Sequence, residues 1–162
     1  MTDFAGEEKT EAARTGGAAR VEGVLISPMR HGGTELLVGV VRDPQWGPVL
    51  AVAVGGIFVE VLRDVSLRVL PADADEVGRM LTELRGLPLL TGARGAMPAD
   101  LDALAKVISG IGELACSLAG LRALEVNPLW VRGNQIEALD VLVLTDQAGN
   151  DQHENNRTEP AR

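Results

Sequence analysis

The chain has 162 residues, of which 46% are hydrophobic and 2% aromatic, and its net charge is −8. This length is typical of one domain, and the core is expected to be aliphatic because only two Phe, two Trp and no Tyr occur. An acidic balance argues against binding to nucleic acid or to an anionic membrane, since both require a basic surface. It agrees with a site for a divalent cation, although plain solubility is the commoner cause of such a charge.

The single cysteine, Cys116, excludes a disulfide within the chain and predicts a reducing, cytoplasmic location. The N-terminus has no apolar signal segment, and Gly or charged residues interrupt every apolar stretch, so no membrane span is expected. Residues 1–21 and 147–162 are polar and lack hydrophobic periodicity, and we expect both to be disordered tails. The predicted folded unit is therefore 22–146.

Extended segments dominate the first half of this unit. Short runs rich in Val, Leu and Ile, separated by turn residues, predict strands over 22–27, 35–42, 48–54, 57–62 and 66–70. The sequence Asp-Pro-Gln-Trp-Gly at 43–47 predicts that the second and third of these form a hairpin. In simple register, this hairpin places Glu35 near Gly55.

Two stripes with helical spacing follow. The first predicts a helix that begins after Asp73 and ends before Gly86, with apolar residues at Val77, Met80, Leu81 and Leu84. The second predicts a helix over about 101–118, opened by Asp100, with apolar residues at Leu101, Leu104, Ile108, Ile111, Ala115 and Leu118. Both stripes are interpreted as core. Two more strands, at 123–131 and 135–144, meet at the hairpin dipeptide Gly133-Asn134. The predicted fold class is α+β, an antiparallel sheet with two main helices.

The C-terminal hairpin carries a candidate metal site. If Gly133 and Asn134 form the turn, Asn127 lies directly opposite Asp140, with Cβ atoms about 4.5–5.5 Å apart. Glu125 precedes Asn127 by two residues and shares its face. Burying these oxygens without a partner is costly, and Mg²⁺ prefers such ligands. The alternative is an edge hairpin that exposes its polar face to water, and composition alone does not decide between the two.

Gly55 and Gly56 form a weaker signal. Paired glycines allow backbone N–H groups to approach a phosphate closely, but they more often form only a turn. Neither a Walker nor a Rossmann motif is present. Glu60 is expected in the same neighbourhood. Arg68 is interpreted either as a ligand of a phosphate or nucleotide-bound carboxylate or as a surface charge beside a strand.

Several segments together resemble the second half of the ATP-grasp domain of ADP-forming acetyl- and acyl-CoA synthetases, relatives of the succinyl-CoA synthetase β subunit. They occur in the family's order and cover about residues 22–146: 23–29 (GVLISPM), 32–39 (GGTELLVG), 41–48 (VRDPQWGP), 55–64 (GGIFVEVLRD), 84–90 (LRGLPLL), 124–128 (LEVNP) and 138–140 (ALD). Each segment alone is unspecific, whereas the set is specific.

The resemblance implies a nucleotide- and Mg²⁺-binding part of an acyl-CoA ligase that moves a phosphoryl group between ADP or ATP and a phosphohistidine on a partner. It implies that Asn127 and Asp140 are Mg²⁺ ligands, supported by Glu125. It also implies a set of nucleotide-contacting or catalytic residues: Ile26, Ser27 and Met29 in a hinge against adenine, and Glu35, Gly55, Gly56, Glu60 and Arg68 around the phosphates.

The chain departs from that family in ways that bear on its partners. The preceding ATP-grasp subdomain, with its nucleotide-binding lysines, and the CoA-binding domain, with its phosphorylated histidine, have no counterpart in this sequence. Both are expected on a partner, and the chain alone is expected to be inactive. Ser27 replaces a common Gln, and Leu142 stands where the family has a basic residue. The alternative function is a non-catalytic remnant or a regulatory binding module of the same fold.

Overall fold

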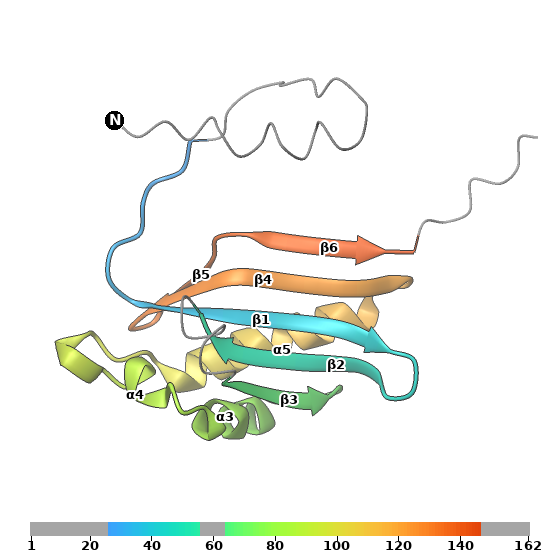
Figure 1. The fold of residues 1–162 in the computed structure, drawn as a ribbon, viewed down its shortest axis with the longest axis horizontal. Helices are drawn as coiled ribbons and strands as arrows, with labels where there is room; N and C mark the ends of the chain where they lie inside the picture. Colours follow the sequence, from blue (N-terminus) through green and yellow to red (C-terminus); the bar gives the residue numbers. More distant parts are fainter. Residues whose placement is uncertain (1–25, 56–63, 147–162) are drawn as a thin grey trace, which may run out of the picture. The chain divides into compact units, whose positions relative to one another are not determined.

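The computed structural model describes residues 26–55 and 64–146. Met1–His31 and Gly32–Arg162 form separate units. In the first unit, residues 26–31 contain no strand or helix, so Ile26 and Ser27 are not in the strand predicted over 22–27. The rest of that predicted strand and the whole of the one predicted over 57–62 lie outside the described residues. All the described helices and strands belong to the second unit (Figure 1).

An antiparallel sheet forms the second unit, as predicted. Its strands are β1 (Thr34–Asp43), β2 (Gly47–Val54), β3 (Val65–Val69), β4 (Leu121–Arg132), β5 (Gln135–Ala138) and β6 (Val141–Thr145). The order is β3-β2-β1-β4, and β5 and β6 both pair with β4 (Figure 1). The single strand predicted over 135–144 is therefore wrong in one respect, because the ladder is interrupted at residues 139–140 and two short strands result.

Two main helices pack against one face of this sheet. They are α3 (Ala74–Glu83) and α5 (Leu101–Ser117), and the Asp73 and Asp100 side chains cap them by accepting from backbone N–H groups at 2.8 and 3.0 Å. The short helices α4 (Leu87–Leu90) and η1 (Ala93–Gly95) were not predicted, because four and three residues are too few to show a helical period. None of the helices in the described part of the chain has the length and hydropathy needed to cross a bilayer.

The core lies between the helices and alternate residues of the strands. Its fully buried side chains come from β1, β2, β4 and both helices; they include Leu36, Val38, Val40, Leu50, Val52, Leu104, Ile108 and Leu129. Such alternation is the expected pattern for a sheet with one covered face. The residues between them, among them Val41, Leu67 and Leu142, therefore lie on the other face and are exposed.

A network of ion pairs joins the edge strand β3 to α3. The Arg68 guanidinium donates to Glu76 and to Glu83, Arg79 also donates to Glu76, and the Ser66 hydroxyl donates to Glu83 at 2.6 Å. Hydrogen bonds from Arg68 lower the pKa of both carboxyl groups below the usual range for Glu. Two carboxylates of the same chain thus already bind the side chain of Arg68.

Stability should therefore depend on pH through Arg68. Because folding lowers the pKa of Glu76 and Glu83, their contribution is complete above about pH 4.3, the unfolded value for Glu, and is lost as the pH falls through the folded values. We expect the free energy of unfolding to fall less between pH 7 and pH 3 in Arg68→Met than in the native chain, as measured by urea titration. An equal fall in both proteins would contradict the assignment.

Candidate metal and nucleotide site

The C-terminal hairpin has the predicted register from its turn to the pair Ala123 and Leu144, beyond which the register shifts. Arg132 pairs with Gln135 around the turn at Gly133, whose φ of 60° suits a glycine, and the same pairing continues to Glu125 opposite Leu142. The backbone N–H of Asn127 donates to the carbonyl of Asp140 at 3.1 Å. Asn127 and Asp140 therefore lie opposite each other, although the ladder is interrupted between β5 and β6.

Three side-chain oxygens remain for a ligand at this position. The amide nitrogen Nδ2 of Asn127 donates to Oε1 of Glu125 at 3.1 Å, which confirms that the two side chains share a face. No donor in the described part of the chain bonds to the Asn127 amide oxygen Oδ1. Oδ1 of Asp140 accepts from the N–H of Val141 at 2.8 Å, which leaves Oδ2. Glu125 contributes its second carboxylate oxygen. Carboxylate and amide oxygens are the donor type that Mg²⁺ prefers.

This donor set is incomplete without further ligands. Across residues 26–55 and 64–146, no three His, Cys, Asp or Glu side chains are grouped closely enough to hold a metal ion. Only two of the three residues at the hairpin are carboxylates, and the third is an amide. Mg²⁺ commonly binds through one or two carboxylates together with phosphate oxygens and water. The residues therefore fit a cation that arrives with a phosphate ligand better than a closed structural metal site.

No helix among residues 26–55 and 64–146 covers the sheet face that carries Glu125 and Asn127. Their neighbours Leu124 and Val126 are buried on the helix side, so Glu125 and Asn127 point to the opposite side. One row of paired residues crosses this open face over five strands: Leu67, Ala51, Gly39, Glu125 and Leu142. Small residues thus stand beside Glu125, and exposed apolar ones form both ends of the row.

Sequence reasoning did not identify this open face. Leu67 and Leu142 are 57% and 54% exposed, and Val41 in the neighbouring row is 58% exposed. The strands are apolar at both alternating positions, a pattern typical of strands covered on both sides. That pattern in β1, β2 and β6 was the available signal for a second covering layer.

Glu35 and Gly55 are adjacent, as predicted. The N–H of Gly55 donates to the Glu35 carbonyl at 2.6 Å, at the end of the β1–β2 hairpin. The amide predicted to approach a phosphate is therefore already used inside the sheet. What requires a glycine at position 55 is the close approach of β1, because a Cβ there would lie 2.9 Å from the Glu35 oxygen. The Glu35 side chain is exposed and, by alternation with Leu36, belongs to the open face.

Of the other predicted residues, the structure places only Arg68 relative to this site. Gly56 and Glu60 lie outside the described residues. Ile26, Ser27 and Met29 belong to the separate N-terminal unit. Arg68 points to α3 on the helix side of the sheet, and its catalytic role stays a prediction that this geometry does not favour.

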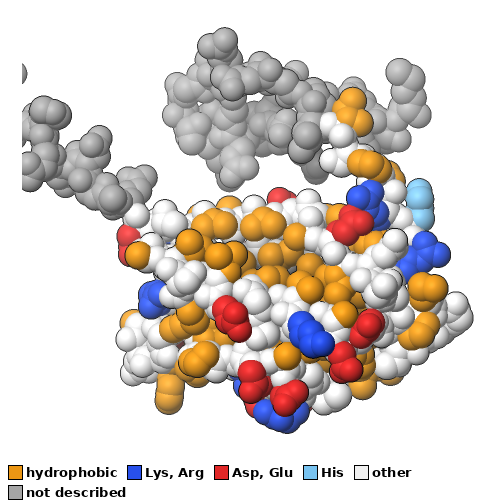
Figure 2. Space-filling model, turned by 180° about the vertical axis from the view of Figure 1, so that it is seen from behind, with side chains coloured by type: hydrophobic (Ala, Val, Ile, Leu, Met, Phe, Trp, Pro, Cys, Tyr) orange, Lys and Arg blue, Asp and Glu red, His pale blue; other side chains and the backbone are white. Residues whose placement is uncertain are grey.

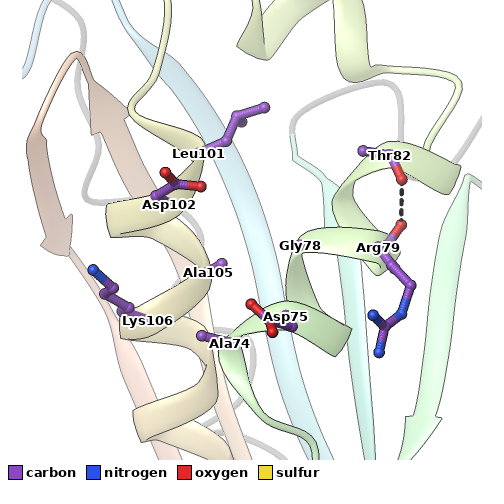
Figure 3. A pocket seen from close by; sticks show the side chains of 9 residues that line it. All are labelled: Ala74, Asp75, Gly78, Arg79, Thr82, Leu101, Asp102, Ala105 and Lys106. Carbon is purple, nitrogen blue, oxygen red and sulfur yellow. Dashed lines mark hydrogen bonds between the residues drawn. The ribbon is translucent and has the colours of Figure 1, made fainter.

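A groove of about 640 Å³ lies elsewhere, between α3 and α5 (Figure 3). Small residues, including Gly78 and Ala105, line its floor, and two acids and two bases surround it: Asp75, Asp102, Arg79 and Lys106. These charges balance, so the groove has no excess of positive charge for a phosphate. It is also on the opposite side of the sheet from Asn127, and we do not assign the nucleotide to it.

Several known proteins are similar to this chain. A family model described as "ATP-grasp domain" matches residues 5–144. The β subunit of acetate–CoA ligase [ADP-forming] I from Pyrococcus furiosus is 40% identical over 122 residues, which are 75% of this chain and 53% of the relative. Acetate–CoA ligase [ADP-forming] I from Archaeoglobus fulgidus is 42% identical over 113 residues, 70% of this chain but 16% of that protein.

Solved structures show the same fold. An acetyl-coenzyme A synthetase 1 from Ca. Korarchaeum cryptofilum, in complex with coenzyme A, Ca-AMPCP and HgCl⁺, matches with a TM-score of 0.75 and 31% identity over 85% of this chain and 60% of that one. The protein PH1788 from Pyrococcus horikoshii matches with a TM-score of 0.73 and 32% identity over 86% and 59%. The chain thus spans little more than half of these proteins.

The close approach of Gly55 to the backbone of β1 can be tested by mutation. In Gly55→Ala the new Cβ would meet backbone of β1, and we expect a loss of about 1–3 kcal/mol of stability, in the range for overpacked sites. Gly39→Ala is the matched control, since its Cβ would meet nothing nearer than 3.8 Å and should be tolerated. Urea unfolding of both variants measures the difference, and equal stability would refute the contact.

Proposed function

The chain belongs to the ATP-grasp domain family, and from that premise we propose that its open sheet face forms one wall of the Mg²⁺–nucleotide site of an ADP-forming acyl-CoA synthetase. One observation carries the proposal: Asn127 of β4 lies opposite Asp140, which stands between β5 and β6, and Glu125 is on the same face as Asn127. Relatives that share this region are named as ADP-forming acetate–CoA ligases.

In this proposal, Asp140 and Asn127 hold a Mg²⁺ ion through Oδ2 and the amide oxygen, and Glu125 orients the Asn127 amide by accepting from its Nδ2. When bound, Mg²⁺ would neutralise charge on the phosphate oxygens during phosphoryl transfer. A related acetyl-coenzyme A synthetase was solved with Mg-AMPPCP and coenzyme A, which supports Mg²⁺ and a nucleotide as the bound molecules. The phosphohistidine that exchanges the phosphoryl group is assigned to a partner.

The row of Leu67, Ala51 and Gly39 beside Glu125 supports a place for a flat, partly apolar ligand and for a second protein layer. An apolar sheet face of this extent is unusual in a protein that acts alone, and it is typical of an interaction site. The chain spans 53% and 48% of the two P. furiosus β subunits that it matches. We therefore propose that a further ATP-grasp subdomain and a CoA-binding polypeptide complete the enzyme.

Asp140→Asn tests the metal role directly. The amide keeps an oxygen that can accept from Val141 but removes the negative charge, so the fold should be retained while Mg²⁺-dependent nucleotide binding weakens at least tenfold. Calorimetric titration with Mg-ADP measures this, using the chain together with a polypeptide that carries the completing subdomain and the CoA-binding domain.

Glu113→Ala, which removes an exposed acid on α5, is the matched control and should bind like the native chain. Unchanged affinity of Asp140→Asn would exclude Asp140 as a ligand. Binding that is tight but independent of Mg²⁺ in the native complex would indicate the alternative, a non-catalytic module of the same fold.

A further inference from the structure

Strand β6 forms an edge of the sheet and is apolar on both faces. Its first four residues are Val141, Leu142, Val143 and Leu144, and each is about half exposed, between 46% and 54%. It pairs with β4 on one side, and no strand among residues 26–55 and 64–146 pairs with its other side. Natural edge strands are usually protected by charge, proline or a covering element, because their unpaired backbone groups attract further strands.

The backbone groups at the outer edge can be assigned from one hydrogen bond. Because Asp140 accepts from Asn127 of β4, alternate residues of β6, namely Leu142 and Leu144, direct their backbone groups toward β4. The residues between them direct theirs outward. The Val141 N–H is already bonded to Asp140 Oδ1, whereas Val143 presents both its N–H and its carbonyl to the outer edge.

The helix side of β6 also exposes an apolar surface. Val141 and Val143 pair with Val126 and Leu124, which are buried, so they share the helix side of the sheet. One flank of α5 carries Ser109 and packs near α3. The opposite flank faces the region of β6 and carries a stripe of four apolar residues: Val107, Ile111, Leu114 and Leu118. Three of these four are exposed apolar residues. Hydrophobic side chains gather along the upper part of the folded unit in Figure 2, where β4 and β6 lie.

Charges at the ends of β6 restrict what can bind there. Asp140 precedes the strand and Asp146 follows it, and both belong to the same face because they are an even number of residues apart. Arg122 approaches Asp146 only to 3.8 Å, with both side chains about 70% exposed. In an antiparallel pair of two copies matched along the full strand, Asp140 would face Asp146 of the second copy at both ends. Like charges directly opposite are destabilising, and each chain also carries a net charge of −8.

We propose that the outer edge of β6 binds an extended segment of another protein, which adds an antiparallel strand to the sheet. The segment is apolar at its centre on the face that it shares with Val141 and Val143, and it carries Lys or Arg at both ends, about 20 Å apart, opposite Asp140 and Asp146. Backbone hydrogen bonds with Val143 supply the attachment, and the end charges select this partner over a second copy. This inference shares Asp140 with the proposed function, and the variants that test it are therefore placed at Val143 and Asp146, which have no part in the proposed metal site.

A synthetic peptide tests the proposal. The fluorescein-labelled probe Lys-Val-Thr-Val-Thr-Val-Lys places its lysines opposite Asp146 and Asp140 when it lies antiparallel to β6. Fluorescence anisotropy at low salt should show saturable binding, and amide exchange of β6 should slow. The same peptide with Glu at both ends, or with N-methyl groups at alternate residues, should bind at least tenfold more weakly.

Two variants of the full chain locate the peptide. Val143→Pro removes an outward N–H without removing a bond to β4 and should weaken binding at least tenfold. Leu67→Pro is its matched control on the opposite edge of the sheet. Because the N–H of Leu70 donates to Pro48 of β2, the backbone N–H of Leu67, three residues earlier, is directed away from β2. Peptide binding should therefore be unchanged in this variant. Asp146→Lys should weaken binding of the peptide with Lys at both ends. It should instead bind a peptide in which Glu replaces the first Lys, opposite residue 146, and a misfolded variant would not show this reversal.

Three outcomes would overturn the inference. Equal binding of Lys-ended and Glu-ended peptides would remove the charge selection. Binding that survives Val143→Pro in a folded chain, judged by circular dichroism, would place the peptide elsewhere. A dimer of the chain by sedimentation that Val143→Pro abolishes would identify a second copy as the occupant.

Discussion

The backbone hydrogen bond from Asn127 to Asp140 continues the pairing that begins at the Gly133-Asn134 turn and carries it past the interruption at residues 139–140. A shift of one residue would turn every β6 side chain to the other face. Glu125 and Asn127 would then no longer share their face with Asp140, and the outward backbone groups would change from those of Val143 to those of Leu142. Both the candidate cation site and the proposed strand-binding edge therefore depend on one register.

The two faces of the sheet have different tasks. On the helix side, fully buried side chains such as Leu104 and Ile108 hold α5 against the strands, and Arg68 links β3 to α3 through carboxylates. On the other side, Gly39 and Ala51 leave room beside Glu125. The stable half of the structure thus positions an open half that is suited to a ligand and to a covering domain, in agreement with relatives that are about twice as long.

Membership of the ATP-grasp domain family and the functional proposal rest on different observations. The family follows from the match over residues 5–144 and from solved structures with TM-scores above 0.7. The proposed role of Asn127 and Asp140 rests on their position opposite each other and on the chemistry of their oxygens. The same register places Leu142 opposite Glu125. The basic side chain that the resemblance implies at position 142 would neutralise this carboxylate, and leucine does not.

Local signals were enough to predict much of this protein from the sequence. Helical spacing and the caps Asp73 and Asp100 predicted α3 and α5, and a Gly-Asn dipeptide predicted the register that sets Asn127 opposite Asp140, because turns and periods depend on neighbouring residues. Tertiary packing decided the rest. It directed Arg68 to Glu76 and Glu83, used the Gly55 amide inside the sheet, and placed all the described helices that pack on the sheet against one of its faces. These outcomes depend on which segments lie side by side in space, and no local pattern contains that information.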